Sequence, residues 1–378
     1  IISDGWSMNI LVRDVIAFYR AIAGQHAPSL ADLRIQYKDY AVWQNEQLNA
    51  GAFEAHKRFW TNKFAGELPA LTLPSRFLRP ALRSSNGRLL GTYLDQETST
   101  LIRAYLKSRG GSLFMFLLAA VKVLFHRYTG DEDIIIGSPV AGREHAELEE
   151  QIGCYINTLA IRSAPEGGVT FDAFFQQLKQ DLLETYTHQA YPFDRLVQDL
   201  GLVRDASRNP LFDVMVALQN TENYDSAERV SEIYLGGKKH DRPALAKFDM
   251  EFTFVEVGER IGMGLNYNTD VYDYESVVKL IEHFQRLVRK MAADGSLTLD
   301  QYDFLSAEER QIVLKGFNDT DITYPANLTV VDLFYQQARQ SPDRIAVSYE
   351  STQLTYRELD ALSNRLANYL LQEQAIQA

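Results

Sequence analysis

Residues 1–7 of the chain read Ile-Ile-Ser-Asp-Gly-Trp-Ser, and residues 8–23 continue directly with helical spacing of apolar side chains. Two apolar residues come first, followed by Asp4-Gly5, with no initiating methionine and no polar lead-in. Because the natural end of a domain is usually polar and loosely ordered, we interpret Ile1 as an internal cut. The stretch then predicts the end of a core strand and the turn that leads into the first helix.

The composition is that of a globular protein with more than one core. A chain of 378 residues exceeds the usual size of one hydrophobic core, so we expect two or three domains or subdomains. Apolar residues make up 46% and charged residues 23%, which are ordinary values. The net charge of −12 argues against a nucleic-acid surface and suits a cytoplasmic enzyme.

Cysteine and histidine usage gives no sign of a disulfide or a metal site. Cys154 is the single cysteine, so it has no partner for an internal disulfide. The seven histidines are scattered, and none forms a His-x-x-x-His pair. The longest apolar stretch, residues 113–121, is far shorter than the roughly 20 residues of a membrane span. We therefore expect no metal and no membrane role.

Helical and strand patterns alternate along the chain. A helix rich in aromatic residues is expected over 30–48, and strands are expected at 133–138 and 154–162. This interleaving predicts α/β layers. Residues 301–327 mix Gly, Asp, Thr and Pro and predict a linker, after which residues 328–378 begin a new unit.

Four further motifs follow one another along the chain. They span residues 37–43 (Tyr-Lys-Asp-Tyr-Ala-Val-Trp), 152–158 (Ile-Gly-Cys-Tyr-Ile-Asn-Thr, with Arg162 four residues on), 188–194 (His-Gln-Ala-Tyr-Pro-Phe-Asp) and 204–211 (Arg-Asp-Ala-Ser-Arg-Asn-Pro-Leu). Residues 354–359, near the C-terminus, read Leu-Thr-Tyr-Arg-Glu-Leu.

These motifs resemble those of the condensation domains of nonribosomal peptide synthetases. Residues 1–7 resemble the second half of the family motif His-His-x-x-x-Asp-Gly, whose two histidines would come directly before Ile1. Residues 354–359 resemble the first core motif of the adenylation domains that follow condensation domains. The resemblance implies an α/β fold like that of chloramphenicol acetyltransferase, in which two subdomains form a V around an active-site tunnel.

The resemblance also divides the chain. It implies that residues 1–70 are the remnant of the N-terminal subdomain and that residues 85–300 are the nearly whole C-terminal subdomain. Residues 328–378 would be the N-terminal piece of an adenylation domain, without its glycine-rich phosphate loop.

The implied activity is that of an amide-forming acyltransferase. In the family, an amine on one carrier domain attacks the thioester carbonyl held by another, and a histidine orients the amine or takes its proton. The implied partners are upstream and downstream peptidyl carrier domains with phosphopantetheine arms, together with the adjacent adenylation domain. ATP and Mg would serve only a complete adenylation domain. Because the catalytic histidine is expected just upstream of Ile1, we expect the 378 residues alone to be inactive.

For the first motif, the resemblance implies mainly structural roles. Asp4 would pair with Arg162 and tie the two subdomains together, since an Arg–carboxylate pair fixes geometry. Gly5 is either a turn glycine or a backbone contact to the oxyanion. Ser7 is a candidate helix N-cap, and Trp6 is a candidate tunnel residue.

Three residues of the later motifs are expected near the tunnel. Asn157 would either meet substrate or tie down a loop. His188 has no nucleophile or acid at a useful spacing and is expected to be a hydrogen-bonded structural histidine, and Arg208 is a candidate contact for the phosphopantetheine.

Two further features of the motifs have structural explanations. Cys154 is expected to be a small core residue rather than a nucleophile. Tyr37, Tyr40 and Trp43 fall on one helix face and predict a packed aromatic stripe.

Three alternatives stay open. A cyclisation domain would carry two aspartates in place of the two histidines. An epimerisation domain is usually not followed directly by an adenylation domain, so residues 328–370 count against it. A non-catalytic domain of the same fold would only dock partner proteins. The form Asp-Gly-Trp-Ser resembles condensation domains that accept an L-configured donor, which makes that type the leading interpretation.

Overall fold

The computed structural model describes residues 2–27, 30–203, 205–219, 227–235, 241–321 and 327–373. Ile1 and Arg204, which belong to predicted motifs, lie outside the described residues, as do residues 322–326 of the predicted linker. The chain forms two compact units, Ile1–Leu305 and Ser306–Ala378. The finer division of the first unit into subdomains 1–70 and 85–300 stays a prediction.

A mixed sheet of seven strands forms the centre of the first unit, in the order β3-β2-β4-β6-β7-β1-β5. The strands are β1 (Asn86–Tyr93), β2 (Ile134–Val140), β3 (Asn157–Ser163), β4 (Val214–Gln219), β5 (Asp241–Leu245), β6 (Met250–Val257) and β7 (Arg260–Asn268). Strand β4 runs parallel to β2 and β6, and the other pairs are antiparallel. The run Ile134–Ile136 is almost fully buried, as its continuous apolar sequence predicts.

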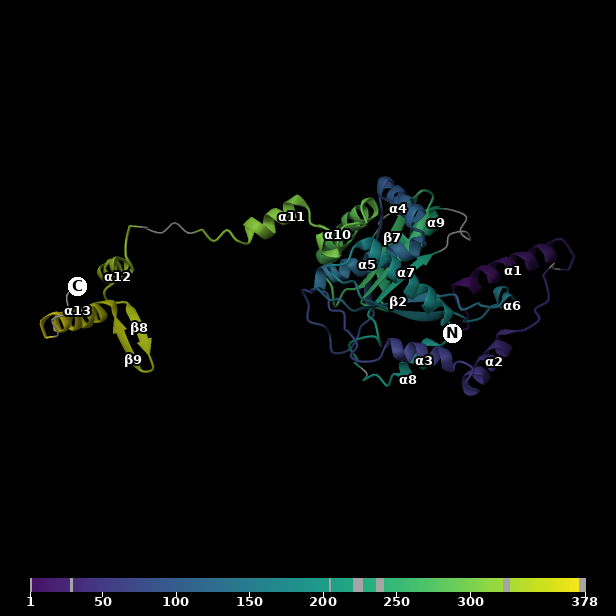
Figure 1. Ribbon diagram of the computed structural model, residues 1–378, viewed down its shortest axis with the longest axis horizontal. Helices are drawn as coiled ribbons and strands as arrows, with labels where there is room; N and C mark the ends of the chain where they lie inside the picture. The colour runs from purple at the N-terminus through teal and green to yellow at the C-terminus, as the bar shows by residue number, and fades with distance from the viewer. Residues whose placement is uncertain are drawn as a thin grey trace. The chain divides into compact units, whose positions relative to one another are not determined.

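Helices surround this sheet (Figure 1). They are α1 (Gly5–Ala23), α2 (Tyr37–Asn49), α3 (Glu54–Lys63), α4 (Gln96–Arg109), α5 (Leu113–Thr129), α6 (Ala146–Glu149), α7 (Phe171–Thr187), α8 (Phe193–Asp199), α9 (Ala227–Leu235) and α10 (Tyr274–Ala293). Helices α4, α5, α7 and α10 pack on one another, and α5 and α7 contact β2, β3 and β4. The predicted α/β layers are therefore present.

Helix α9 lies against β1, β6 and β7. A Cβ atom at Gly91 would lie 1.8 Å from the carbonyl oxygen of Leu235, and one at Gly264 would lie 2.0 Å from that of Tyr234. Glycine at these two positions therefore lets the end of α9 approach the sheet.

Two elements begin later than the sequence suggested. The helix expected over 30–48 begins at Tyr37, where Asp39 accepts the backbone N–H of Gln36 at 2.9 Å and so caps the first turn. The strand expected from Cys154 begins at Asn157, since the backbone N–H of Tyr155 is donated to Asp4 instead of to the sheet.

No single helix among the described residues is long and apolar enough to cross a membrane, and only α4 and α5 taken together, bent by 109°, meet the length and composition of a span. Met115–His126 of α5 are all buried within the first unit.

The second unit contains α11 (Ala307–Gln311) with a π-turn over Ile312–Gly316, α12 (Val330–Gln340), the hairpin of β8 (Ile345–Tyr349) and β9 (Thr352–Thr355), and α13 (Tyr356–Glu373). Helix α13 packs on α12 and on both strands.

Lys122 is a fully buried lysine in the core of the first unit. Its Nζ donates hydrogen bonds to the carbonyl oxygens of Ile134 in β2 (2.7 Å) and Ile161 in β3 (2.8 Å). Burial lowers the pKa of Lys122 to about 7, from an ordinary value of 10.5.

We predict a pH dependence of stability from Lys122. Between pH 7 and 10.5 the unfolded chain holds a proton that the folded chain has lost, so the stabilisation from this site grows as the pH rises. Urea midpoints should therefore rise from pH 7.5 to pH 9 more steeply in the wild type than in Lys122→Met. The exposed Lys107→Met variant should keep the wild-type slope, and an unchanged slope in Lys122→Met would contradict the prediction.

Candidate functional site

Asp4 lies at the centre of a buried polar network that joins the start of α1 to residues 143–155. Its Oδ1 accepts the backbone N–H of Ser7 (2.9 Å) and the guanidinium of Arg143 (3.1 Å), and its Oδ2 accepts the backbone N–H of Tyr155 (3.0 Å). The side chains of Asp4 and Arg143 are only 4% and 2% exposed. Burial alone would raise the pKa of Asp4, but the hydrogen bonds from Ser7 and Tyr155 and the charge of Arg143 lower it below its ordinary value.

Arg143 holds the connection between β2 and β3 in a tight turn. It donates to the carbonyl oxygens of Leu148 and Gln151, and its guanidinium lies 4.2 Å from the ring centroid of Tyr155. Gly142 begins this turn with φ of +65°, and a Cβ atom there would lie 2.0 Å from the carbonyl oxygen of Tyr155. The turn is therefore fixed by one cation and one glycine.

The predicted pair of Asp4 with Arg162 is wrong. Arg162 forms an ion pair with Asp133 (2.6 Å) and donates to the carbonyl oxygens of Lys63, Ala65 and Glu67. It lies five residues beyond Asn157 on β3, about 16 Å further along the extended strand. Arg162 therefore fastens the end of α3, and the brace of Asp4 is Arg143.

The other residues of the first motif take separate positions. Asp4, and not Ser7, is the N-cap of α1. Ser7 is fully buried, and its hydroxyl accepts the N–H of Gly153 (3.0 Å). The indole N–H of Trp6 donates to the carbonyl oxygen of Glu149 (2.9 Å). Gly5 is the first residue of α1, and a Cβ atom there would meet nothing within 4 Å.

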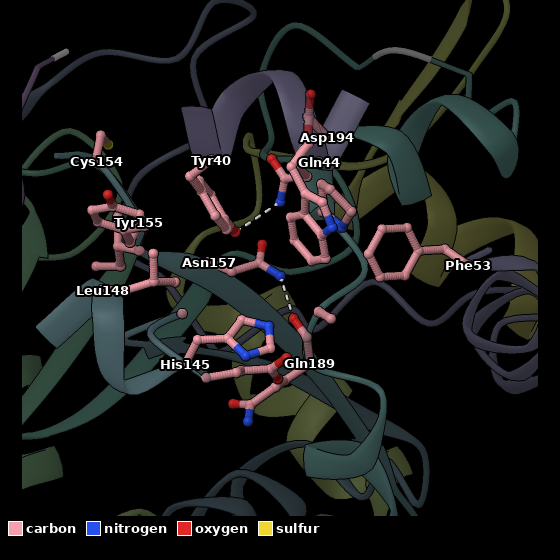
Figure 2. A pocket seen from close by; sticks show the side chains of 16 residues that line it. Tyr40, Gln44, Phe53, His145, Leu148, Cys154, Tyr155, Asn157, Gln189 and Asp194 are labelled. Carbon is pink, nitrogen blue, oxygen red and sulfur yellow. Dashed lines mark hydrogen bonds between the residues drawn. The ribbon is translucent and has the colours of Figure 1, made fainter. Parts of the chain in front are cut away.

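A cavity of about 180 Å³ lies beside this network (Figure 2). Its walls come from α2, the connection between β2 and β3, and the segment that leads into α8. The lining residues are Tyr40, Trp43, Gln44, Phe53, Gly142, Glu144, His145, Leu148, Cys154, Tyr155, Ile156, Asn157, Gln189, Ala190, Pro192 and Asp194. Three of the five predicted motifs thus contribute residues to one cavity.

Asn157 fixes one wall of the cavity. Its Nδ2 donates to the carbonyl oxygens of Gln189 and Tyr191, both at 2.8 Å, and its Oδ1 accepts the backbone N–H of Phe193 at 3.1 Å. Figure 2 shows the bond to Gln189 as a dashed line. The expectation that Asn157 ties down a loop therefore describes these contacts, while contact with substrate stays a prediction.

The aromatic stripe of α2 packs on one side and faces the cavity on the other. Tyr37 and Tyr40 lie 5.1 and 4.9 Å from the ring of Tyr155, between ring centroids. Tyr40 and Trp43 also line the cavity. Cys154 lines it as well and is partly buried, so the description of Cys154 as a core residue holds only in part.

His188 does not line the cavity, although the next residue, Gln189, does. Its Nδ1 is 3.0 Å from Nδ1 of His56, and its ring stacks on Phe59 with centroids 4.0 Å apart. The indole N–H of Trp60 donates to the carbonyl oxygen of His188. Burial, with a smaller contribution from His56, lowers the pKa of His188 below its ordinary value. These contacts fit the predicted structural histidine.

Arg208 is bound by three protein groups. It pairs with Asp213 (2.6 Å) and donates to the carbonyl oxygen of Leu71 (3.1 Å) and the hydroxyl of Thr72 (3.0 Å). It lines a second, more apolar cavity, formed by residues 68–71, 135, 197–198, 201–203, 205–206 and 208–213. A contact to phosphopantetheine stays a prediction.

The comparison with protein families settles what kind of domain carries this arrangement. The family described as "Condensation domain" matches residues 1–314. The chain belongs to the condensation domain family. The family described as "AMP-binding enzyme" matches residues 334–377, so the second unit contains the start of such a domain. Both findings confirm the resemblance seen in the motifs.

Curated relatives of this condensation domain are much longer synthetases. Gramicidin S synthase 2 of Brevibacillus brevis is 40% identical over 372 residues, which is 98% of this chain and 8% of that protein. Tyrocidine synthase 3 of Brevibacillus parabrevis is 39% identical over 375 residues, 98% of this chain and 6% of that protein. Bacitracin synthase 2 of Bacillus licheniformis is 38% identical over 377 residues, which is 100% of this chain and 14% of that protein. The chain is thus a condensation domain of the modular nonribosomal peptide synthetase type and spans a small part of each relative.

Solved structures share the fold. A four-domain nonribosomal peptide synthetase bound to AMP and glycine superposes with a TM-score of 0.78 at 23% identity, covering 97% of this chain and 28% of that one. The X-domain from teicoplanin biosynthesis has a TM-score of 0.70 at 24% identity, and the match covers 80% of this chain and 70% of that one. The predicted α/β condensation fold is confirmed.

Sequence reasoning missed the residues that organise the condensation domain's site. No spacing in the sequence relates Arg143 to Asp4, which is 139 residues away. Glu144 and His145, which follow it, line the cavity without belonging to a predicted motif. Among the described residues, no three His, Cys, Asp or Glu side chains are grouped as metal ligands.

We predict that Asp4 and Arg143 are coupled in stability. Asp4→Ala leaves a buried guanidinium without its carboxylate, so the free energy of unfolding should fall by about 3–5 kcal/mol. Asp14→Ala on the same helix, which breaks an exposed pair with Arg13, should cost less than about 1 kcal/mol. Urea denaturation of both variants tests this, and Asp4→Ala combined with Arg143→Met should cost less than the sum of the single changes. Strictly additive costs would show that the two side chains are not coupled.

We predict a second pH effect from His188. Its lowered pKa means that the unfolded chain binds a proton before the folded one, so this contribution to stability is lost as the pH falls below about 6.5. Removing the neighbouring imidazole in His56→Leu should raise the pKa of His188, measured by NMR titration of the ring protons. The exposed His26→Gln variant should leave it unchanged. A pKa that does not respond to His56→Leu would exclude electrostatic coupling between the two rings.

Proposed function

We propose that this condensation domain forms an amide bond between a carrier-bound acyl donor thioester and a carrier-bound aminoacyl acceptor, with an L-configured donor. The observation that carries the proposal is the family match over residues 1–314, which includes Asp4-Gly5 of the motif. In this family the catalytic histidine belongs to the same loop. The Asp4–Arg143 network supports the proposal because it holds this loop against residues 153–155.

The reaction transfers an acyl group from sulfur to nitrogen. The neutral acceptor amine attacks the thioester carbonyl, the tetrahedral intermediate collapses, the C–S bond breaks, and the amine proton leaves as the thiolate is released and protonated. The backbone N–H of Gly5, in the first turn of α1, is the candidate donor to the oxyanion. Asp4 fixes geometry, because a carboxylate that accepts the N–H and hydroxyl of Ser7 and the N–H of Tyr155, and pairs with a buried arginine, is a poor base.

The partners follow from this chemistry. Donor and acceptor would arrive on phosphopantetheine arms of upstream and downstream peptidyl carrier domains, and the arms are substrates rather than resident cofactors. ATP and Mg belong to a complete AMP-binding domain. Residues 328–378 contain no glycine and hence no glycine-rich phosphate loop, so they do not fit ATP by themselves. A cytoplasmic location stays a prediction.

A docking domain of the same fold is a second candidate. It is favoured by the structural similarity to an X-domain solved in complex with OxyB (TM-score 0.69, 23% identity). Such a domain would bind a partner without forming an amide.

We predict that a synthetase module containing this chain, with a complete His-His-x-x-x-Asp-Gly motif and loaded donor and acceptor carriers, forms a dipeptidyl thioester detectable by mass spectrometry. Changing the second histidine to alanine should abolish the product, and Cys154→Ala should keep it. An L-configured donor should react faster than its D-isomer. The 378 residues alone should give no product, because they contain Asp4-Gly5 without the two histidines.

The same assay separates the alternatives. No product from a folded module that still binds its carriers would favour the docking domain. Two aspartates at the histidine positions would indicate a cyclisation domain.

A further inference from the structure

The hydroxyl group of Ser7 joins three parts of the first unit at one buried point. It shares its proton between Oδ1 of Asp4 (2.7 Å) and the carbonyl oxygen of Gly153 (2.8 Å). It accepts the backbone N–H of Gly153 and an N–H of Arg143, both at 3.0 Å. A serine hydroxyl has one proton and two lone pairs, so these contacts use it completely. Ser7 is fully buried and does not line the cavity.

Gly153 is enclosed on its other side. A Cβ atom there would lie 2.4 Å from Cδ2 of Tyr37 and 2.6 Å from Cε2 of Tyr155, so the two rings pack directly on the backbone. Gly153 is buried, and both of its polar backbone groups bind the Ser7 hydroxyl. Buried peptide groups need hydrogen-bond partners. Loss of the hydroxyl would therefore leave an N–H and a carbonyl oxygen unpaired, and the segment around Gly153 would have to move to satisfy them.

Residues 153–157 carry this contact to the cavity, because Tyr155 and Asn157 both line it. On the other side of the contact, Ser7 lies in the first turn of α1, two residues after Gly5, whose N–H is the candidate donor to the oxyanion. The Ser7 hydroxyl therefore bridges the loop of the proposed chemistry and one wall of the cavity, although it touches neither substrate nor solvent.

We propose that Ser7 is a positioning residue for amide formation, whose hydroxyl holds the first turn of α1 against Gly153 and so fixes the catalytic loop beside the cavity. This inference rests on the proposed function, in which the catalytic histidine and Gly5 belong to that loop. A displacement of about 1 Å at a reacting centre can cost roughly a hundredfold in rate. Burial raises the pKa of Asp4, and the Ser7 hydroxyl is the largest of the contacts that lower it, so Ser7 also keeps Asp4 ionised for its pair with Arg143.

Ser7→Ala separates this role from the other contacts of the network. Alanine keeps the backbone N–H that Asp4 accepts, so the cap of α1 and the pair with Arg143 remain, while both bonds to Gly153 are lost. In the synthetase module with the complete motif, kcat for the dipeptidyl thioester should fall at least tenfold. KM for the acceptor carrier should stay within twofold of wild type, because Ser7 does not touch the substrates. Ser7→Cys, whose thiol is a weaker donor and acceptor, should give a kcat between the two.

Ser99→Ala is the matched control. Ser99 is also fully buried in the first turn of a helix, and its hydroxyl donates to the carbonyl oxygen of the N-cap Asp95 (3.0 Å) and accepts the N–H of Ile261 (3.3 Å). It does not line the cavity. Both variants lose the same atom from the same kind of site, so both urea midpoints should fall, while kcat of Ser99→Ala stays within twofold of wild type. Equal falls of kcat in the two variants, or a raised KM with unchanged kcat in Ser7→Ala, would overturn the proposal.

Amide hydrogen exchange on the 378-residue chain tests the link without any catalytic assay. The amide of Gly153 should exchange at least tenfold faster in Ser7→Ala than in the wild type, while the amide of Phe193, which Asn157 binds, should change less than twofold. Unchanged exchange at Gly153 would overturn the proposal. A wild-type module that forms no product would contradict the proposed function and with it the catalytic part of this inference, and the exchange rates would then decide the structural link alone.

Discussion

The buried pair of Asp4 and Arg143 is the interaction on which the rest of the site depends. Removing both charges from water is costly, and their attraction offsets this cost together with hydrogen bonds to other groups, although the Nε of Arg143 is buried without a partner. Asp4 accepts from Ser7 and Tyr155, and Arg143 donates to the carbonyl oxygens of Leu148 and Gln151. The network therefore contributes little to net stability and much to geometry. It fixes the connection between β2 and β3 against the start of α1, and this connection supplies one wall of the cavity.

Asn157 fixes another wall of the cavity by binding backbone atoms, as Arg143 fixes the turn between β2 and β3. One amide binds three backbone groups of the segment 189–193 and so holds this segment at the start of β3, while Tyr191 and Phe193 pack on the core. Both walls are thus fixed by polar side chains that bind backbone atoms.

The fold and the family could be predicted from the sequence, but the side-chain contacts of the site could not. The apolar run placed the strand expected at 133–138 closely, because a continuous apolar run such as Ile134–Ile136 is buried on both faces of the sheet. The Asp4 brace was assigned to the wrong arginine because Arg143 and Arg162 stand on the same two-strand unit, and sequence spacing does not say which end of that unit faces α1. The choice depends on where β3 starts, which is decided by Asp4 itself through the N–H of Tyr155.

The charge of the cavity follows from the same arrangement. Arg143 is the cation closest in sequence to Glu144, yet Asp4 and the carbonyl oxygens of the turn already occupy it. Glu144 lines the cavity together with Tyr40, and Asp194, in the first turn of α8, lines it as well. The brace that caps the start of α1 therefore also fixes the turn that brings Glu144 and Tyr155 to the cavity, and this links the motif of Asp4 to the shape of the site.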